Sequence, residues 1–473
     1  MGNKPSGPTL TDAKGLGGVI AQDGFDYQLW DGLSRLPAWL ANPSFEEMIF
    51  EGLEDLEARF FAPQAPRHRL IERYQAKSGN LAPKDVEEVF ESFQKFEQAY
   101  PSVARLHTLV TPRLPQTLGW LARDPWRVRK ARPFYAPFVD VAAASDAKLK
   151  HDLIAAFGNS LGAFVADAVE VAERNLPVRD SALQAFMLSL MRSFPTIDVK
   201  RVEQAFEALG ALARRNIGAP LSRAVLASIL STELGQALPL PKSFPLHIRS
   251  DRNEVDETAL EIDASAFSGG SRPYPDPDVW TEGLVQPLDR TARWLRTRGL
   301  SRVSLGGSYR LTTGFTIGWS LRSAIGFELE IPTREGSWST DERQDPSEAY
   351  GSWAIDGTLN LKGETLLVSI GILRDPSAEL RNAGVGTLGT TVLRAFLPQA
   401  LTSARSAQHG VGVVKAAVAT AVAQLRPQKV DLYIAGPAAF AVALGHRWNG
   451  LPPTQLHEFL TRDGRYVPTA LLK

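Results

Sequence analysis

The chain has 473 residues, more than one hydrophobic core usually supports, so we expect two or three domains. Its 52 basic and 52 acidic residues cancel, which excludes nucleic-acid binding through a global positive field and leaves only local basic patches. Cysteine is absent, which excludes disulfides, Cys-based zinc sites and a Cys nucleophile, so any metal should be a hard, oxygen-liganded ion. Without a leader pattern or a membrane-spanning apolar run, the protein is expected to be cytoplasmic and to have no membrane partner.

The first predicted element is a helix over residues 23–40, after a Gly-, Pro- and Ser-rich lead-in over residues 1–18. Apolar side chains recur at helical spacing, at Phe25, Leu29, Leu33, Leu36 and Leu40. Gln28 lies in this helix and is either a site residue or a buried amide that tethers the helix. We favour the tether.

Residues 49–79, IFEGLEDLEARFFAPQAPRHRLIERYQAKSG, have the pattern of a β-hairpin, with two apolar-rich runs around a Pro-bearing connector at residues 62–68. Side chains alternate between the faces of a strand. One face of the first strand should therefore carry Glu51, Leu53, Asp55 and Glu57. One face of the second strand should carry Gln75 and Lys77.

This pattern is typical of a hydrolytic metal site. The Asp55 carboxylate can hold a divalent cation, and Gln75 adds a neutral amide oxygen. Lys77 can stabilise the charge that develops on a phosphate or orient the attacking water. An exposed Asp55–Lys77 salt bridge is the structural alternative. Other carboxylates compete with Asp55 as the main ligand, namely Glu51, Glu54 and Glu57.

An amphipathic helix is predicted over residues 83–100, and a buried strand over residues 105–111. The helix has one apolar stripe, formed by Val86, Val89, Phe90, Phe93 and Phe96. Residues 118–134 then interleave tryptophan with arginine and lysine, which suggests a contact with the DNA backbone. The candidate phosphate-binding side chains are Arg127, Arg129, Lys130 and Arg132. The equally weighted alternative is a solvated face on which arginine side chains extend over buried tryptophan.

The order helix, hairpin, helix, strand resembles the PD-(D/E)xK nuclease core, in its variant with Gln before x-Lys. Three segments carry the resemblance: residues 24–28 (GFDYQ), 51–55 (EGLED, placed on the first strand) and 74–77 (YQAK, placed on the second). Together they resemble the endonuclease domain of SAVED-domain effectors in CBASS anti-phage systems. The resemblance implies a restriction-endonuclease-like fold and cleavage of double-stranded DNA. It also implies Mg²⁺ (or Mn²⁺) on Asp55 and Gln75, with Glu51, Asp55, Gln75 and Lys77 as catalytic residues.

Residues 142–238 are rich in helix-forming residues and are predicted to be packed helices that extend the nuclease domain or form a spacer. Residues 238–245, LPLPKSFP, are the most plausible linker. Beyond it, strands are expected over residues 247–262, 303–305, 352–361, 364–373 and 430–434. Helices are expected over residues 280–298, 312–323, 411–425 and 439–445.

A strand, a glycine-containing turn and a helix occur in this order twice, which predicts two α/β half-units. Ligands of open α/β sheets bind outside the carboxyl ends of the strands. This rule gives a candidate ligand set of Gly306, Gly307, Ser308, Tyr309, Arg310, Thr312, Gly436, Pro437 and Ala438. Trp353 is a further candidate for base stacking, or a core residue. Residues 384–389, GVGTLG, match GxGxxG but do not follow a strand directly, so we interpret them as a loop and exclude a dehydrogenase.

The segments LGGSYRLTTGFTIGWSL (residues 305–321) and DLYIAGPAAFAVALGHRWN (residues 431–449) resemble the SAVED domain, a fusion of two CARF-like Rossmannoid units. The chain is thus expected to be α/β, or α+β overall, with a nuclease core at residues 19–140, its helical extension at 141–238 and a SAVED domain at 239–473. The resemblance implies binding of a cyclic tri- or dinucleotide from a CD-NTase, homo-oligomerisation, and activation of non-specific DNA degradation. Two alternatives are a non-catalytic cyclic-nucleotide sensor whose first domain binds DNA or a protein, and an RNase on the same fold.

Overall fold

The structure is a computed structural model in which the chain divides into two compact units, Met1–Leu240 and Pro241–Lys473. The side chains of residues 13–21, 105, 129 and 136–139 lie outside its description. The described residues are 13–52, 55–129, 136–175, 179–192, 194, 196–238, 242–250, 259–269, 273–334, 336–342, 350–358, 364–383, 385, 391–461 and 463–473. No helix in these ranges is long and apolar enough to span a bilayer.

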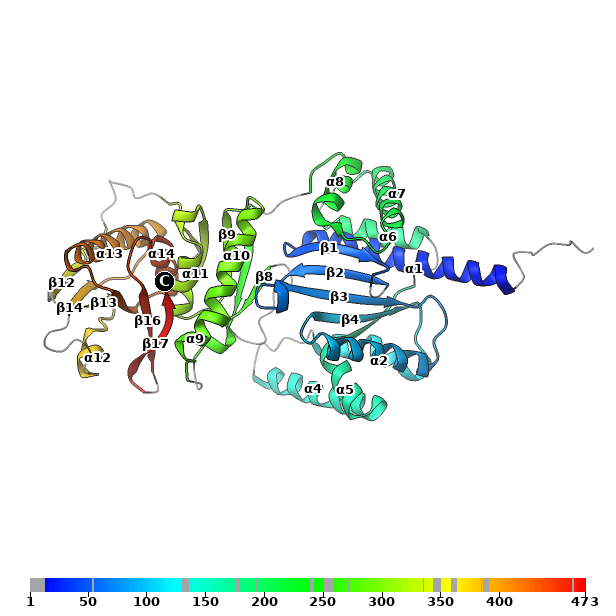
Figure 1. The fold of residues 1–473 in the computed structure, drawn as a ribbon, viewed down its shortest axis with the longest axis horizontal. Helices are drawn as coiled ribbons and strands as arrows, with labels where there is room; N and C mark the ends of the chain where they lie inside the picture. The colour runs from blue at the N-terminus through cyan, green and yellow to red at the C-terminus, as the bar shows by residue number, and fades with distance from the viewer. Residues whose placement is uncertain are drawn as a thin grey trace, which may run out of the picture. The chain divides into compact units, whose positions relative to one another are not determined.

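The first unit is built on a six-stranded sheet in the order β5-β4-β3-β2-β1-β6 (Figure 1). Its strands are β1 (Phe45–Phe50), β2 (Leu56–Phe61), β3 (Arg69–Ala76), β4 (Ala104–Thr111), β5 (Val169–Glu173) and β6 (Leu221–Ser222). The strands β1, β2 and β3 pair antiparallel, whereas β3, β4 and β5 pair parallel. The carboxyl ends of β3 and β4 therefore meet at one edge of the sheet, where residue 77 follows β3.

Two hydrophobic cores hold the helices of this unit to the sheet. The first core packs α1 (Ala13–Ala41), α6 (Arg179–Leu190), α7 (Val199–Arg215) and α8 (Arg223–Leu234) against β1, β2 and β3. The second joins β4 and β5 to α2 (Pro83–Ala99), η2 (Gln116–Ala122), α4 (Ala136–Phe157) and α5 (Asn159–Ala168). Figure 1 shows the two helix groups on different sides of the sheet. The short helix α3 (Asp124–Arg129) links η2 to α4.

The helix and strand predicted after the hairpin are confirmed as α2 and β4, and the predicted stripe on α2 is buried at Val86, Val89, Phe90 and Phe93. The first helix begins ten residues earlier than predicted, at Ala13. Residues 142–238 were predicted to be packed helices, yet they also supply β5 and β6 to the sheet. The two strands have only five and two residues, so their patterns are too short to stand out from the helical sequence around them.

The predicted hairpin over residues 49–79 is partly wrong. Its connector at residues 62–68 does join two antiparallel strands, β2 and β3, and it includes the short 3₁₀ helix η1 (Pro66–His68). However, the first predicted strand is broken, because β1 ends at Phe50 and β2 begins at Leu56. Glu51 has φ +52°, a left-handed conformation that an extended strand does not contain. Glu51 and Asp55 therefore lie between the two strands, and they do not share a strand face with Glu57. Leu53 lies outside the described residues.

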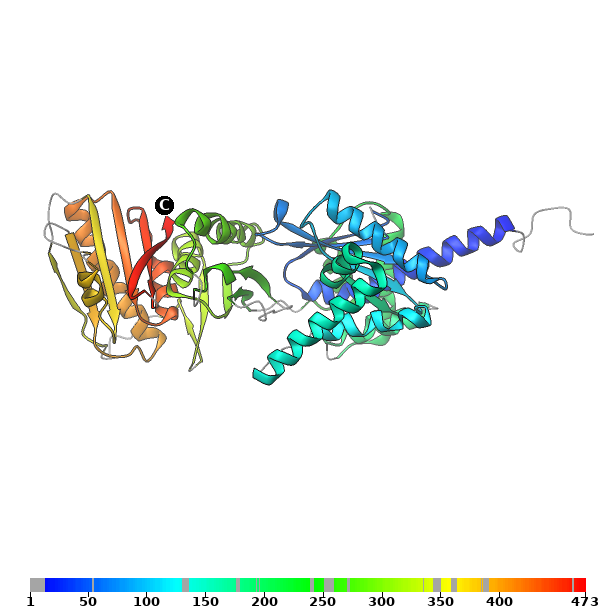
Figure 2. The ribbon, with the colours of Figure 1, turned by 90° about the horizontal axis from the view of Figure 1, so that it is seen from below.

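The second unit contains two sheets, as Figure 2 shows from below. The first sheet has the order β11-β10-β9-β7-β8 and is formed by β7 (Phe244–Arg249), β8 (Leu260–Asp263), β9 (Arg302–Gly307), β10 (Glu328–Thr333) and β11 (Gly336–Ser339). The second has the order β12-β14-β13-β15-β16-β17. Its strands are β12 (Ala354–Thr358), β13 (Thr365–Ile372), β14 (Thr391–Leu397), β15 (Lys429–Ala435), β16 (Thr454–Leu460) and β17 (Arg465–Leu472).

Each sheet contains four parallel strands, which confirms the prediction of two α/β half-units. The helical elements are α9 (Pro277–Trp280), η4 (Thr281–Val285), α10 (Gln286–Thr297), α11 (Leu311–Ser320), α12 (Ser377–Asn382), α13 (Ala404–Leu425) and α14 (Ala438–Arg447), with two short 3₁₀ turns, η3 (Ser265–Phe267) and η5 (Ser323–Ile325). Residues 247–262 were predicted as one strand but contribute to two, β7 and β8, which pair parallel.

Helices α11 and α14 follow equivalent strands of the two half-units and pack against each other (Figure 1). Gly314 faces Ala438 and Val442, and Gly318 faces Val442 and His446, so the two helices run in the same direction. A Cβ on Gly318 would lie 2.0 Å from the Val442 carbonyl oxygen. Glycine is thus required here by close backbone approach, and this approach brings both helix N-termini to the same end of the unit.

Burial of His446 on α14 makes the stability of this unit depend on pH. Its Nε2 lies 2.9 Å from the Phe327 carbonyl oxygen, to which the neutral ring donates, and burial lowers its pKa to about 4. The unfolded chain binds a proton near pH 6.5, so it holds more protons than the folded protein between pH 6.5 and pH 4. We expect stability to fall as the pH drops through this window, by about 2 kcal/mol between pH 7 and pH 5.

This prediction is tested by denaturant unfolding of the full chain at several pH values, beside His446→Gln. Glutamine retains an N–H donor but does not titrate, so the difference between the two proteins isolates the histidine. Equal pH dependence in both proteins would show that His446 is not the titrating group.

Candidate functional site

The strongest cluster in the first unit lies where β2 begins and β3 ends. In the β2–β3 register Leu56 is paired with Tyr74, so one step further along this register sets Asp55 opposite Gln75. The Asp55 Oδ2 accepts a hydrogen bond of 2.7 Å from the Ala76 N–H. Lys77 comes directly after β3, and its own N–H donates to the Val110 carbonyl of β4 at 2.8 Å. Three of the four predicted catalytic residues are therefore brought together by the β2–β3 register and the β3–β4 edge.

The Asp55 carboxylate is partly buried, and burial raises its pKa. The bond from Ala76, the Lys77 ammonium and a hydrogen bond from Gln28 act in the opposite direction and favour the charged form. The Asp55 carboxylate is thus oriented by the backbone of β3 and by Gln28. Because a carboxylate has about four lone-pair sites, it can accept these hydrogen bonds and still bind a cation.

Gln28 reaches Asp55 because α1 is anchored firmly beside the sheet. One turn along α1, the buried Asp31 forms ion pairs with Arg35 (2.8 Å) and with Arg174 after β5 (2.9 Å). The Tyr27 hydroxyl donates to the Arg174 carbonyl at 2.8 Å. On sequence grounds we favoured Gln28 as an amide that tethers the helix, over Gln28 as a site residue. In the structure Gln28 contacts the candidate acid directly, which is what the less favoured interpretation predicts.

The remaining carboxylates have different roles. Glu57 is buried and forms an ion pair with Arg59 at 3.1 Å, so it is a structural residue rather than a rival ligand. Glu51 is exposed in the turn, its N–H donates to the Asp55 carbonyl at 2.9 Å, and its pKa is raised by burial and by the Asp55 charge. Glu54, the third rival, lies outside the described residues. Among the described carboxylates, Glu51 therefore lies close enough to Asp55 for their two charges to interact.

One specific observation indicates that these residues fit a hard divalent cation. The Gln75 Oε1 is buried yet has no hydrogen-bond partner among the described residues, although buried polar atoms are nearly always paired. An amide oxygen of this kind, beside a carboxylate, is a ligand that Mg²⁺ or Mn²⁺ accepts. Within the described residues no group of three or more His, Asp or Glu side chains is placed to hold a metal. The fit therefore depends on amide oxygen as well as carboxylate.

The predicted DNA-backbone patch is only partly described. Arg127 is exposed on α3, whereas the Arg129 side chain, Lys130 and Arg132 lie outside the described residues. Trp126 is 51% exposed, which argues against the alternative of arginine side chains over a buried tryptophan at this position. The DNA contact stays a prediction.

In the second unit the two predicted glycine turns lie at the carboxyl ends of β9 and β15, beside the parallel N-termini of α11 and α14. Gly307 has φ +82° and approaches the Ile248 carbonyl so closely that a Cβ would lie 2.1 Å from it. Ser308, Arg310 and Pro437 are exposed at this end, where a ligand can reach them. We call the predicted set of residues at this end, from residue 306 to 312 and from 436 to 438, the candidate ligand face.

One predicted member of this face, Thr312, is engaged within the protein. The buried Glu458 carboxylate of β16 accepts the Thr312 N–H at 2.8 Å, and the Thr312 hydroxyl lies 3.1 Å from that of Thr469. Thr312 is 3% exposed and belongs to the core. The sequence held no signal for Glu458, because 146 residues separate it from its partner.

The aromatic candidates are constrained as well. Trp353 is half-buried and stacks on Phe440 of α14, with ring centroids 5.9 Å apart, so one of its faces is already used in packing. Tyr309 is half-buried, and burial raises the pKa of its hydroxyl. Arg310 is exposed, and its Nε donates to the Ser268 carbonyl at 2.6 Å, which leaves the other guanidinium nitrogens for a ligand.

The GVGTLG segment is outside the described residues except for Val385. Helix α12 lies between the end of β13 and this segment, so the glycines do not follow the strand directly. A dinucleotide fingerprint requires that they do. The exclusion of a dehydrogenase on sequence grounds agrees with this arrangement.

Comparison with known proteins extends these observations. Residues 287–472 match the family model of SAVED, the SMODS-associated and fused to various effectors sensor domain. The CD-NTase-associated protein 4 of Moraxella osloensis is 23% identical over 476 residues, which cover 98% of this chain and 99% of that protein.

Solved structures give the same result for the fold. The Acinetobacter baumannii Cap4 SAVED/CARF-domain containing receptor with the cyclic trinucleotide 2'3'3'-cAAA has a TM-score of 0.73 at 21% identity, covering 95% of this chain and 98% of that one. The Moraxella osloensis Cap4 receptor has a TM-score of 0.69 at 21% identity, covering 96% and 100%. The chain is thus similar to Cap4 proteins over nearly its whole length, shares their mixed α/β fold, and carries in its second unit a segment that matches the SAVED sensor domain.

Proposed function

We propose that this protein is a DNA endonuclease effector of CBASS anti-phage defence, activated when its second unit binds a cyclic oligonucleotide. The observation that carries the proposal is the cluster in which Asp55 lies opposite Gln75, beside Lys77, with the Gln75 amide oxygen buried and unpaired. The order α1-β1-β2-β3-α2-β4 in the first unit supports a restriction-endonuclease-like core. Similarity to Cap4 supports the sensor half.

In this proposal Asp55 and Gln75 hold Mg²⁺ or Mn²⁺, with Glu51 as a further carboxylate near the site. The ion, when bound, polarises the phosphate and lowers the pKa of water. Gln28 and the Ala76 N–H fix the orientation of the Asp55 carboxylate. The Lys77 ammonium stabilises the negative charge that builds up on the phosphate during attack by water. Exposed Arg127 contributes to backbone binding of double-stranded DNA without reading its sequence.

The candidate ligand face is proposed to bind a cyclic trinucleotide. Two structures of the Acinetobacter baumannii relative contain such ligands, 2'3'3'-cAAA and 3'3'3'-cAAA. Arg310 is proposed to pair with a phosphate, and the exposed turns at residues 306–308 and 436–438 to contact the ring of the ligand. Thr312 is excluded from direct contact because it is buried. Ligand binding is proposed to drive homo-oligomerisation, which activates the nuclease.

The proposal is tested by incubating purified full-length protein with plasmid DNA and Mg²⁺, with and without a panel of cyclic di- and trinucleotides. We expect cleavage only with one of the cyclic nucleotides, and none when EDTA is present. Measurable binding of a cyclic nucleotide without cleavage would instead favour a non-catalytic sensor whose first unit binds DNA or a protein. Cleavage of RNA but not of DNA would favour an RNase on the same fold.

A further inference from the structure

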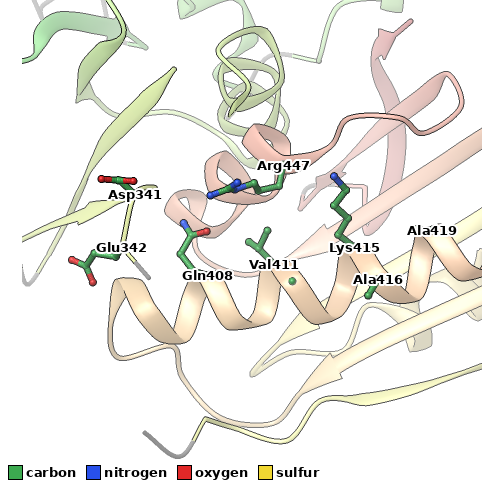
Figure 3. Close-up of a pocket in the computed structure, with 9 residues that line it drawn as sticks. Asp341, Glu342, Gln408, Val411, Lys415, Ala416, Ala419 and Arg447 are labelled. Atoms are coloured by element: carbon green, nitrogen blue, oxygen red, sulfur yellow. The ribbon is translucent and has the colours of Figure 1, made fainter. Parts of the chain in front are cut away.

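A cavity of about 700 Å³ lies along α13, in a part of the second unit that the proposed function does not use. Successive turns of α13 supply a floor of small and apolar residues, Val411, Gly412, Ala416 and Ala419. Figure 3 shows Lys415 and Arg447 projecting over this helix, while Asp341 and Glu342 lie toward its beginning. The cavity therefore has a positive part and an acidic part above an apolar floor.

Among the described residues, the hydrogen-bond partners of the two cations of this cavity are neutral. Lys415 donates to the Asn449 side-chain oxygen at 2.6 Å, and Arg447 makes long contacts with the Ser323 hydroxyl (3.5 Å) and the Thr340 carbonyl (3.3 Å). Across the described ranges, no carboxylate forms an ion pair with either group. Burial and the nearby Arg447 charge lower the pKa of Lys415. Two half-buried positive charges that repel each other without an anion between them are costly in a merely structural role.

The cavity is separate from the candidate ligand face. Arg447 is the last residue of α14, whereas Pro437, at the candidate ligand face, directly precedes the first. A ten-residue helix is about 15 Å long at 1.5 Å per residue. A ligand bound at one end of α14 therefore does not occupy the other.

We propose that this cavity binds a phosphate-bearing ligand of mononucleotide size, with its phosphate on Lys415 and Arg447. The Arg447 guanidinium can bind a phosphate through two parallel hydrogen bonds, and the Lys415 ammonium adds a compact positive charge. The carboxylates of Asp341 and Glu342 accept hydrogen bonds from ribose hydroxyls or a base amine. The apolar floor between them covers the sugar or base, and the volume is within the range of small-molecule sites.

The test is isothermal titration calorimetry of the full-length protein with AMP, ATP and inorganic phosphate, and with cyclic triadenylate as a comparison. We expect AMP or ATP to bind, inorganic phosphate to compete with it, and Lys415→Gln to weaken the binding at least tenfold. Lys415→Arg, which keeps the charge, should restore most of the affinity. The matched control is Arg296→Gln, which removes one positive charge from the exposed face of α10 and should change nothing.

Several results would overturn this proposal. No binding of AMP, ATP or phosphate at millimolar concentration would do so, as would binding that is unchanged in Lys415→Gln. Binding of cyclic triadenylate alone, insensitive to Lys415, would assign the ligand to the candidate ligand face instead. Because Lys415 and the nuclease cluster lie in different units, loss of nucleotide binding with retained DNA cleavage separates this proposal from the proposed function.

Discussion

Replacement of Lys77 with alanine is expected to lower the rate of ligand-activated DNA cleavage by about 10³-fold, the loss typical when one preorganised charge-stabilising group is removed. Lys77 follows β3 directly, with its N–H fixed by the Val110 carbonyl, and its charge acts on Asp55. The measurement is the initial rate of plasmid cleavage at saturating cyclic nucleotide.

The matched control for Lys77 is Lys84→Ala on α2. Lys84 is 83% exposed and pairs only with Glu88, at 3.5 Å, so its loss should leave the rate unchanged. Cyclic-nucleotide binding should be equal in both variants and the wild type, because the proposed site of that ligand lies in the other unit. Cleavage at the wild-type rate by Lys77→Ala would remove Lys77 from the catalytic set.

Substitution of Gly318 by alanine is expected to destabilise the second unit by about 3 kcal/mol. The new Cβ would lie 2.0 Å from the Val442 carbonyl oxygen and 2.7 Å from the His446 nitrogen, both of them backbone atoms of α14. Neither atom can move without moving the helix, so α11 and α14 must separate. The higher helix propensity of alanine relative to glycine offsets only about 1 kcal/mol of this loss. Denaturant unfolding of the full chain measures the loss.

The reciprocal contact gives a second test of this helix pair. A Cβ on Gly445 would lie 2.1 Å from the Phe315 carbonyl oxygen, so Gly445→Ala should be similarly destabilising. The double variant should lose less than the sum, because one separation of the helices relieves both clashes. Gly119→Ala, where no atom lies within 4 Å of the new Cβ, is the control. A Gly318→Ala protein as stable as this control would show that the helices do not pack as described.

Local patterns were sufficient for much of the fold. The apolar stripe of Val86, Val89, Phe90, Phe93 and Phe96 predicted α2, although Phe96 is only half-buried. The repeated strand, glycine turn and helix predicted β9 with α11 and β15 with α14. These elements are long or strongly periodic, so their own side chains specify them. The same reasoning failed after Phe50, because the predicted strand was continued past Glu51, whose backbone is left-handed.

The candidate site, like the fold, could be predicted from the sequence only in part. The sequence alone predicted Asp55, Gln75 and Lys77 as catalytic residues, from their resemblance to a known motif, but it could not rank the neighbouring carboxylates. That ranking depends on partners that are distant in the chain or face the sheet interior. Glu57 forms an ion pair with Arg59. Gln28 reaches Asp55 from α1, and this helix is held in place by the ion pair between Asp31 and Arg174, which lie 143 residues apart.

The sequence by itself therefore determined which residue types are available: no cysteine, a Gln-x-Lys pair after an acidic run, and two glycine turns before helices. Only the tertiary structure decided which of them remain available for chemistry. Glu458 accepts the N–H of Thr312, which the sequence had made a candidate ligand residue, while Lys415 and Arg447 are left without an anionic partner among the described residues. The physical reason is that hydrogen bonds and ion pairs form between residues that folding brings close, and sequence separation gives no measure of that distance.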